Sequence, residues 1–180
     1  MVKLNAKQLR SHQSSAVSRQ KIAKNEIYII LDNVLDTYNV GSIFRLADGV
    51  GAKKVYLCGS TSTPPNPRIK KASINTTEWV EWSYSENVVG VIREIREKVP
   101  KIQIVAVEQS EKSVPYNKFD YNLPLALVVG HETYGVSKEV LEMVDGVVEI
   151  PMFGVNISLN VMVSLAIVLY KALEKTVCAD

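Results

Sequence analysis

The chain has 180 residues, of which 47% are hydrophobic and 22% are charged, and its formal net charge is +2. This length and composition favour one soluble globular domain with a substantial core. The two cysteines, Cys58 and Cys178, and the two histidines, His12 and His131, match no metal-ligand spacing. The sequence therefore predicts neither a metal site nor a disulfide framework.

Positive charge is concentrated at the N-terminus. Residues 1–25 contain no acid, and their basic residues are Lys3, Lys7, Arg10, Arg19, Lys21 and Lys24. Such a segment favours a polyanionic partner, although a solvated leader explains it equally well. We divide the chain into a basic N-terminal extension, 1–25, and a domain, 26–180. The extension lacks the apolar segment of a signal peptide, so we expect a cytoplasmic location.

Apolar and polar patterns predict alternating strands and helices along the domain. The predicted strands are 27–31, 53–58, 102–107, 125–129 and 147–150, and the predicted helices are 42–50, 86–98, 137–144 and 158–174. Residues 59–73 are rich in Pro, Ser and Thr and are predicted to form a long loop. Alternation of this kind predicts an α/β fold with a mostly parallel sheet and helices on both faces.

The segment VNISLNVMVSLAIVLY, residues 155–170, combines a polar start with an apolar continuation. Its apolar part, 161–170, is about half the roughly 20 residues that a membrane span requires, so we expect no membrane association. Asn156-Ile157-Ser158 fits a glycosylation pattern, which carries no weight without a secretory signal. A buried helix remains, with Asn160 and Ser164 on one face. Because a buried amide must satisfy both of its ends, Asn160 is a candidate to hold a ligand or another loop.

Three polar loops, 32–41, 130–136 and 151–160, follow predicted strands. In open α/β sheets, ligands bind at the carboxyl ends of the strands. Two residues near these loops have simpler interpretations when each is taken alone. Arg45 could pair with Asp48 on the surface of a helix, and Glu132 could be a solvated residue in a turn.

The order of three motifs is more specific than any one of them. The motifs are Asn39-x-Gly41-x-x-x-Arg45, then Gly130-x-Glu132-x-x-Gly135, then Ile150-Pro151-Met152 with Ser158-Leu159-Asn160. This order resembles the SpoU/TrmH family, within the SPOUT class of S-adenosylmethionine-dependent RNA methyltransferases, over about residues 27–174. The resemblance implies a C-terminal deep trefoil knot and a homodimer formed through the knot region.

The resemblance also implies roles for individual residues. The expected reaction is methylation of a ribose 2′-hydroxyl in tRNA or rRNA, with tRNA favoured because several compact members modify tRNA. Arg45 matches the arginine at the reacting ribose, and because a guanidinium stays charged near neutral pH, electrostatic stabilisation is favoured over proton removal. The family's remaining polar site positions are matched by Asn39, Glu132, Ser158 and Asn160, and the positions that contact S-adenosylmethionine by Gly130, Ile150 and Leu159.

Contacts to the RNA are expected from basic residues and from one family position. The leader and the basic end of the 59–73 loop are expected to bind phosphates through Lys21, Lys24, Arg68, Lys70 and Lys71. We expect Glu132 and Asn160 to orient Arg45 and the loops, within one subunit or across a dimer. Ile157 stands where the family often has Gln or Arg, which leaves the RNA contact at this position open.

Three other functions compete with this interpretation. A nucleotide-dependent oxidoreductase would need Gly-x-Gly-x-x-Gly directly after the first strand, whereas the glycines of GVGAKK, 49–54, lie between a helix and a strand. A knotted RNA-binding or assembly protein without catalysis would have little use for the polar residues of the three motifs. A methyltransferase that acts on a base keeps the cofactor, but the loop with Asn39 and Arg45 favours ribose.

Overall fold

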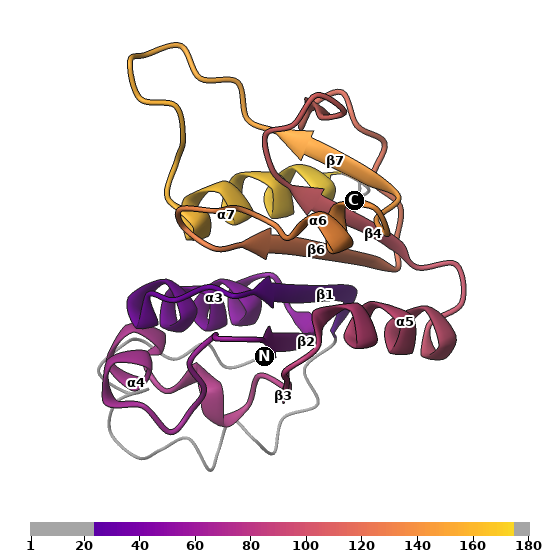
Figure 1. Cartoon of the computed structure of the whole chain (residues 1–180). Helices are drawn as coiled ribbons and strands as arrows, with labels where there is room; N and C mark the ends of the chain where they lie inside the picture. The colour runs from indigo at the N-terminus through magenta and orange to yellow at the C-terminus, as the bar shows by residue number, and fades with distance from the viewer. Residues whose placement is uncertain (1–23, 175–180) are drawn as a thin grey trace.

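The strands of the computed structural model, which describes residues 24–174, form one parallel sheet (Figure 1). Their order across the sheet is β3-β2-β1-β6-β4-β7-β5, and every neighbouring pair is parallel. The strands are β1 Asn25–Asp32, β2 Ala52–Cys58, β3 Trp82–Ser85, β4 Gln103–Val107, β5 Val114–Pro115, β6 Leu125–Gly130 and β7 Gly146–Glu149. The predicted α/β fold with a mostly parallel sheet is confirmed.

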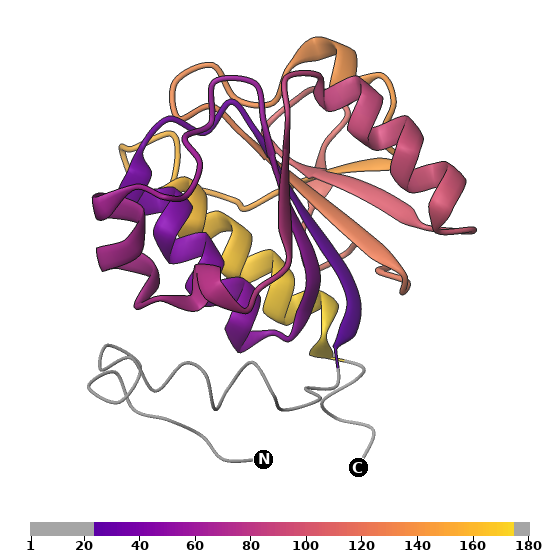
Figure 2. The same ribbon diagram turned by 90° about the horizontal axis from the view of Figure 1, so that it is seen from below.

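Helices cover both faces of this sheet, as predicted (Figure 2). They are α3 Thr37–Gly49, α4 Pro67–Ser73, the 3₁₀ helix η1 Thr76–Glu78, α5 Val88–Lys98, α6 Lys138–Leu141 and α7 Val161–Ala172. On one face, α3, α4 and α7 bury a core that includes Phe44, Ile69 and Leu165. On the other face, α5 and α6 bury a second core that includes Ile92 and Val140.

Helix α4 lies where the sequence predicted only a loop, so that prediction is wrong over 67–73. The side chain of Asn66 accepts hydrogen bonds from the amides of Arg68 (2.9 Å) and Ile69 (3.3 Å), and Pro67 occupies the first helical position. Both are ordinary signals for the start of a helix. Strands β3 and β5 were also not predicted, and α6 is shorter than the predicted 137–144.

Gly41 allows α4 to pack closely against α3. A Cβ atom at this position would lie 2.6 Å from the Cβ of Ala72 and 2.7 Å from the carbonyl oxygen of Ile69. Real Cβ atoms do not approach backbone or side chains so closely, so only glycine fits here without movement of α4. The glycine of the first motif therefore has a packing role.

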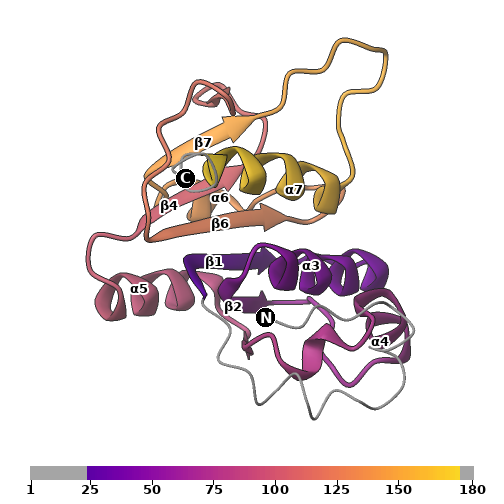
Figure 3. The same cartoon turned by 180° about the vertical axis from the view of Figure 1, so that it is seen from behind.

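Helix α7 begins at Val161 rather than at the predicted Ser158. Asn160 is its N-cap residue and therefore does not share a helical face with Ser164 in the way predicted. Residues 150–160 instead form an extended segment that projects from the rest of the chain (Figures 1 and 3). The predicted burial of this helix is only partly found. Leu165 is fully buried, but Val163 is 38% exposed and Tyr170 is 57% exposed.

The direction in which the chain adds strands to the sheet changes between β1 and β6. From β1 the chain proceeds outward through β2 and β3, whereas β4, β6 and β7 lie on the other side of β1. Asp32 ends β1 directly opposite Gly130, which ends β6. Ligands of open α/β sheets bind outside such a switch point. Within residues 24–174, no helix combines the length and apolar character needed to cross a bilayer.

Candidate active site

A cleft of about 550 Å³ lies at the carboxyl ends of β4, β6 and β7. This volume is within the usual range for sites that bind small molecules. Its lining includes six of the eight residues matched to catalytic or cofactor positions, namely Gly130, Glu132, Ile150, Ser158, Leu159 and Asn160. Asn39 and Arg45 are not among the lining residues.

Two glycines close the loop that forms one wall of the cleft. The amide of His131 donates to the carbonyl of Gly135 (3.0 Å), and the amide of Gly135 donates back (2.8 Å). A Cβ on Gly130 would lie 2.2 Å from the carbonyl group of Gly135, and Gly135 itself has a φ of +70°. Side chains at either position would force the loop apart, so both glycines are required for this close backbone approach.

Two carboxylates that the sequence interpretation missed fix the end of the same loop. Glu108, directly after β4, accepts a hydrogen bond from the amide of Val136 (2.8 Å). Asp32, which is 1% exposed at the end of β1, accepts one from the amide of Ser137 (2.8 Å). The sequence contained a signal for both residues, because each is an acidic residue directly at the end of an apolar strand.

The projecting segment is tied to the β4 loop by a further residue that was missed. The side-chain amide of Gln109 donates to the carbonyl oxygen of Ile157 at 2.7 Å. Because this bond reaches only the backbone of residue 157, it does not depend on which side chain stands there. The Ile157 side chain itself is 78% exposed.

Glu132 connects the second motif to the first. Its carboxylate accepts hydrogen bonds from the amide of Leu35 (3.0 Å), the amide of Asp36 (2.9 Å) and the side-chain amide of Asn39 (3.0 Å). Partial burial acts to raise the pKa of Glu132, but these hydrogen bonds outweigh it and the pKa lies below its ordinary value. Glu132 is therefore an anion that organises the loop before α3.

Asn160 connects the third motif to the same point. Its Nδ2 donates to Oδ1 of Asn39 (2.9 Å), and its own Oδ1 accepts hydrogen bonds from the amides of Met162 (3.0 Å) and Val163 (3.4 Å). We call the hydrogen-bonded set Glu132, Asn39 and Asn160 the motif bridge. It joins one residue from each motif across sequence separations of 93 and 121 residues.

Arg45 lies outside the motif bridge. Its side chain is exposed on α3, and within residues 24–174 it forms no hydrogen bond or ion pair. The simpler interpretation, a pair with Asp48, is not found, because Asp48 accepts a hydrogen bond from Nε1 of Trp79 (2.7 Å). Within one protomer, Glu132 and Asn160 hold Asn39 rather than orienting Arg45 as we expected.

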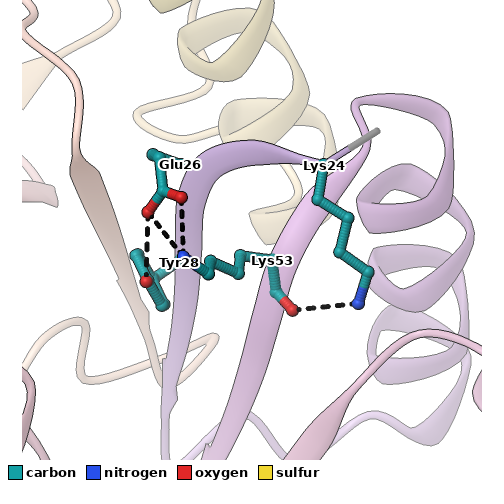
Figure 4. Close-up of polar contacts among 4 residues, drawn as sticks. All are labelled: Lys24, Glu26, Tyr28 and Lys53. Atoms are coloured by element: carbon teal, nitrogen blue, oxygen red, sulfur yellow. Dashed lines mark hydrogen bonds and ion pairs between the residues drawn. The ribbon is translucent and has the colours of Figure 1, made fainter. Parts of the chain in front are cut away.

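The basic residues expected to bind RNA fall into separate places. Arg68, Lys70 and Lys71 are all exposed on α4, whereas Lys24 precedes β1 at the amino end of the sheet, away from the cleft. There the Nζ of Lys24 donates to the carbonyl oxygen of Lys53 at 3.3 Å (Figure 4). Lys21 lies outside the described residues.

No group of three or more His, Cys, Asp and Glu side chains in residues 24–174 is placed to hold a metal ion. Cys58 is buried at the end of β2, and burial raises the pKa of its thiol to about 12, with a smaller effect from Asp32. Such a thiol is un-ionised near neutral pH and is a poor nucleophile. Cys178 lies outside the described residues.

The cleft fits S-adenosylmethionine chemically. Val107, Val129 and Val148 supply apolar surface at the strand ends, and Gly130 leaves backbone accessible where a side chain would intrude. Glu108 and Glu149 also line the cleft and complement the positive charges of this cofactor. The lining therefore combines apolar strand ends with a larger number of polar groups, which can fix the orientation of a polar cofactor.

The model of the SpoU rRNA Methylase family matches residues 26–170. The chain belongs to the SpoU family. A similar curated protein is the tRNA (guanosine(18)-2′-O)-methyltransferase of Aquifex aeolicus, which is 35% identical over 170 residues, covering 92% of this chain and 75% of that protein. The Escherichia coli K12 protein of the same name is 29% identical over 150 residues, covering 82% of this chain and 62% of that protein.

Solved structures of the SpoU family have the same fold. The A. aeolicus TrmH/SpoU tRNA modifying enzyme superposes with a TM-score of 0.77 at 32% identity, covering 94% of this chain and 81% of that chain. The AdoMet-bound rRNA methyltransferase of Sinorhizobium meliloti superposes with a TM-score of 0.76 at 28% identity, covering 88% and 59%. The family predicted from the three motifs and the predicted α/β fold are confirmed, as is S-adenosylmethionine as the family's cofactor.

Proposed function

We propose that this chain transfers a methyl group from S-adenosylmethionine to a ribose 2′-hydroxyl of tRNA. Membership of the SpoU family and the names of the Aquifex and E. coli relatives support the reaction and the substrate. The observation that carries the proposal is the motif bridge, which gathers polar groups from all three motifs beside a cofactor-sized cleft.

The cofactor is held by the cleft through backbone and apolar contacts. Gly130, Ile150 and Leu159 line it and are the residues that we assign to cofactor binding, with Ser158 beside them. When bound, S-adenosylmethionine supplies a methyl group activated by a positively charged sulfur. The residues of the chain orient this group and keep the reacting atoms close, which can account for much of the rate gain.

Arg45 stabilises the charge that develops on the ribose oxygen. S-adenosylmethionine bound in the cleft would supply the methyl group that this oxygen accepts, and the hydroxyl proton would pass to a substrate phosphate or to solvent. An arginine side chain stays charged near neutral pH, so it acts electrostatically rather than as the base. Asn39, Glu132 and Asn160 position the loops around this reaction.

Arg45 reaches the cleft of a second copy in a homodimer. It lies away from the cleft of its own protomer, on an exposed part of α3, which runs beside α7 (Figure 2). The exposed side of α7 carries apolar residues, including Val163 and Tyr170, that a second copy would cover. By resemblance to the SpoU family, the loops 130–136 and 150–160 would form a deep trefoil knot, and we propose this knot and a dimer through it here.

A mixed-dimer experiment tests this arrangement. Arg45→Ala copies and Leu159→Trp copies, in which the indole fills the cleft, are each expected to be inactive. Their heterodimer contains one open cleft served by one intact Arg45, so activity returns only if Arg45 acts across the dimer. Purified heterodimers that do not transfer a methyl group would contradict the proposal. A monomeric mass in sedimentation analysis would contradict it as well.

Replacement of Arg45 tests its catalytic role directly. Arg45→Ala is expected to abolish methyl transfer to tRNA while calorimetry shows unchanged binding of S-adenosylmethionine. Near-normal turnover by this variant would refute the role. Loss of cofactor binding would show instead that Arg45 belongs to the cofactor site.

RNA binding depends on phosphate contacts from the leader and from α4. Deletion of residues 1–24, which removes Lys21 and Lys24, is expected to weaken tRNA affinity and flatten its salt dependence. Unpaired nucleotides are the expected targets, because their riboses can enter a pocket, and the cytoplasm is the compartment that holds this substrate. Mapping 2′-O-methyl groups in RNA from cells with and without the gene identifies the nucleotide.

A further inference from the structure

A second hollow, of about 480 Å³, lies at the edge of the sheet on the side of β3. It is lined by the loop after β2 and by two aromatic residues of β3, namely Gly59, Ser60, Thr61, Ser62, Thr63, Trp82 and Tyr84. The hollow opens at the carboxyl ends of the strands, as the cofactor cleft does. None of its lining residues takes part in the function proposed above.

The two aromatic rings of this hollow are held in place and remain accessible. Tyr84 is 46% exposed, and its hydroxyl donates a hydrogen bond to the carbonyl oxygen of Gly59 (2.8 Å). The ring of Trp82, two residues earlier on the same face of β3, meets Phe44 edge-on with centroids 6.3 Å apart. Rings fixed in this way lose little freedom when a flat ligand stacks on them.

The opposite wall of the hollow is equally fixed. Oδ1 of Asn33 accepts hydrogen bonds from both the amide and the hydroxyl of Ser60 (2.9 Å each). Oγ1 of Thr61 accepts one from the amide of Val34 (3.0 Å). Within the described part of the chain the hydroxyls of Ser62 and Thr63 form no hydrogen bond, which leaves them available to the edge of a base.

Positive charge lies next to this hollow. Its loop continues directly into α4, where Arg68, Lys70 and Lys71 are exposed. Helix α4 also covers the same face of the sheet as Trp82, because Ile69 and Trp82 both pack into the core around Phe44. A flat ligand joined to an anionic backbone therefore matches both the aromatic wall and the neighbouring cations.

We propose that this hollow binds an unpaired nucleobase of the substrate RNA, stacked on Tyr84 and Trp82, while Arg68, Lys70 and Lys71 contact the adjoining phosphates. Stacking on aromatic side chains is a general mode of binding single-stranded RNA. The inference rests on the proposed function, because it assumes an RNA substrate. It adds a subsite for a nucleotide other than the one that is methylated.

The test compares two substitutions at Tyr84 in the full chain. Tyr84→Ala removes the ring, and we expect it to weaken binding of an unmodified tRNA transcript by at least about fivefold, as loss of one stacked base does. Tyr84→Phe keeps the ring and loses only the bond to Gly59, so its affinity should stay within about twofold of normal. We expect Tyr84→Ala to raise the KM for tRNA without changing cofactor binding or the dependence of tRNA affinity on salt. Arg68→Ala should instead reduce the slope of log affinity against log salt concentration by about one.

A fluorescence measurement covers the case in which Tyr84→Ala does not fold. Trp79 and Trp82 are the only tryptophans of the chain, so Trp82 is the sole one in a Trp79→Phe variant. Stacking of a base should quench the emission of Trp82 when tRNA is added. As a control, Leu123→Ala, at an exposed position before β6, should leave this quenching unchanged. Normal tRNA affinity of Tyr84→Ala, or unchanged Trp82 emission in the tRNA complex, would overturn the subsite. If tRNA is still methylated in that case, the proposed function stands. Absence of any tRNA binding by the unmodified protein would overturn the proposed function as well.

Discussion

The amino ends and the carboxyl ends of the strands, here called the amino edge and the carboxyl edge of the sheet, carry similar polar groups that make different kinds of contact. At the amino edge, the Nζ of Lys53 pairs with the carboxylate of Glu26 (2.6 Å), and the hydroxyl of Tyr28 reaches the same carboxylate (3.4 Å) (Figure 4). At the carboxyl edge, the motif bridge connects loops that are far apart in the sequence. The first arrangement links adjacent strands that the sheet already joins, whereas the second joins loops that no strand pairing connects. Disruption at the carboxyl edge should therefore have the larger consequences.

Removal of the Glu132 carboxylate is the strongest test of this difference. Glu132→Ala leaves the amides of Leu35 and Asp36 and the side chain of Asn39 without their acceptor, so the loop before α3 loses its fixed position. Displacement of catalytic groups by about 1 Å can cost about 100-fold in rate, and we expect a loss of methyl transfer of that order. Single-turnover assays at saturating tRNA measure it. A rate within threefold of normal would show that the motif bridge is not needed for catalysis.

The next largest effect concerns the packing of α4 on α3. Gly41→Ala places a methyl group 2.6 Å from the Cβ of Ala72, and such overpacking typically costs about 1–3 kcal/mol in the free energy of unfolding. Urea denaturation gives this value. The matched control is Gly90→Ala in α5, whose nearest neighbour would be Asn87 at an ordinary 3.6 Å, so the higher helix propensity of alanine should leave stability unchanged or raised. Equal effects of the two substitutions would contradict the close-packing role of Gly41.

A smaller effect depends on pH through the lowered pKa of Glu132. A carboxyl group whose pKa is lower in the folded than in the unfolded state stabilises the protein above its unfolded pKa, near 4.3. That contribution is lost as the pH falls through the folded-state pKa. The difference in urea midpoint between the unmodified protein and Glu132→Gln should therefore shrink between about pH 6 and pH 3. A difference in urea midpoint that stays constant over this pH range would show that ionisation of Glu132 does not contribute to stability.

The smallest effect is expected at the amino edge. The hydrogen bond from Lys53 to Glu26 raises the pKa of Lys53, but the two side chains are 44% and 48% exposed. Exposed ion pairs contribute about 0–1 kcal/mol, so Glu26→Gln should change the unfolding free energy by less than about 1 kcal/mol and leave methyl transfer unaltered. A loss of activity in this variant would mean that the amino edge takes part in function.

Most of the sheet was predictable because its central strands are buried on both faces. Strands β1, β4 and β6 are continuous apolar runs in the sequence and need no other signal. The edge strand β3, with sequence WSYS, buries too little to show such a run, and β5 has only two residues. Helix α4 was missed although Asn66 and Pro67 marked its start, because the surrounding Pro, Ser and Thr residues suggested a loop.

The site was predictable in its residue types but not in its connections. Asn39, Glu132 and Asn160 were chosen from their motifs, and the structure shows that they bond to one another rather than to Arg45. Pairing across 93 and 121 residues depends on how the loops meet in space, which neither periodicity nor spacing encodes. Asp32 and Glu108 were overlooked for the same reason, since their partners are backbone amides of another loop.

The hydrogen bonds of the motif bridge all point in one direction. The first amides of α7 donate to Asn160, Asn160 donates to Asn39, and Asn39 donates to Glu132. Each amide is thus polarised by the next, and the negative charge of Glu132 is electrostatically coupled to the positive end of the α7 helix dipole. An aspartate at position 39 would interrupt this polarity, because a carboxylate cannot donate to Glu132. The one-way order of donors explains why an amide, with an acceptor on one side and a donor on the other, is suited to position 39.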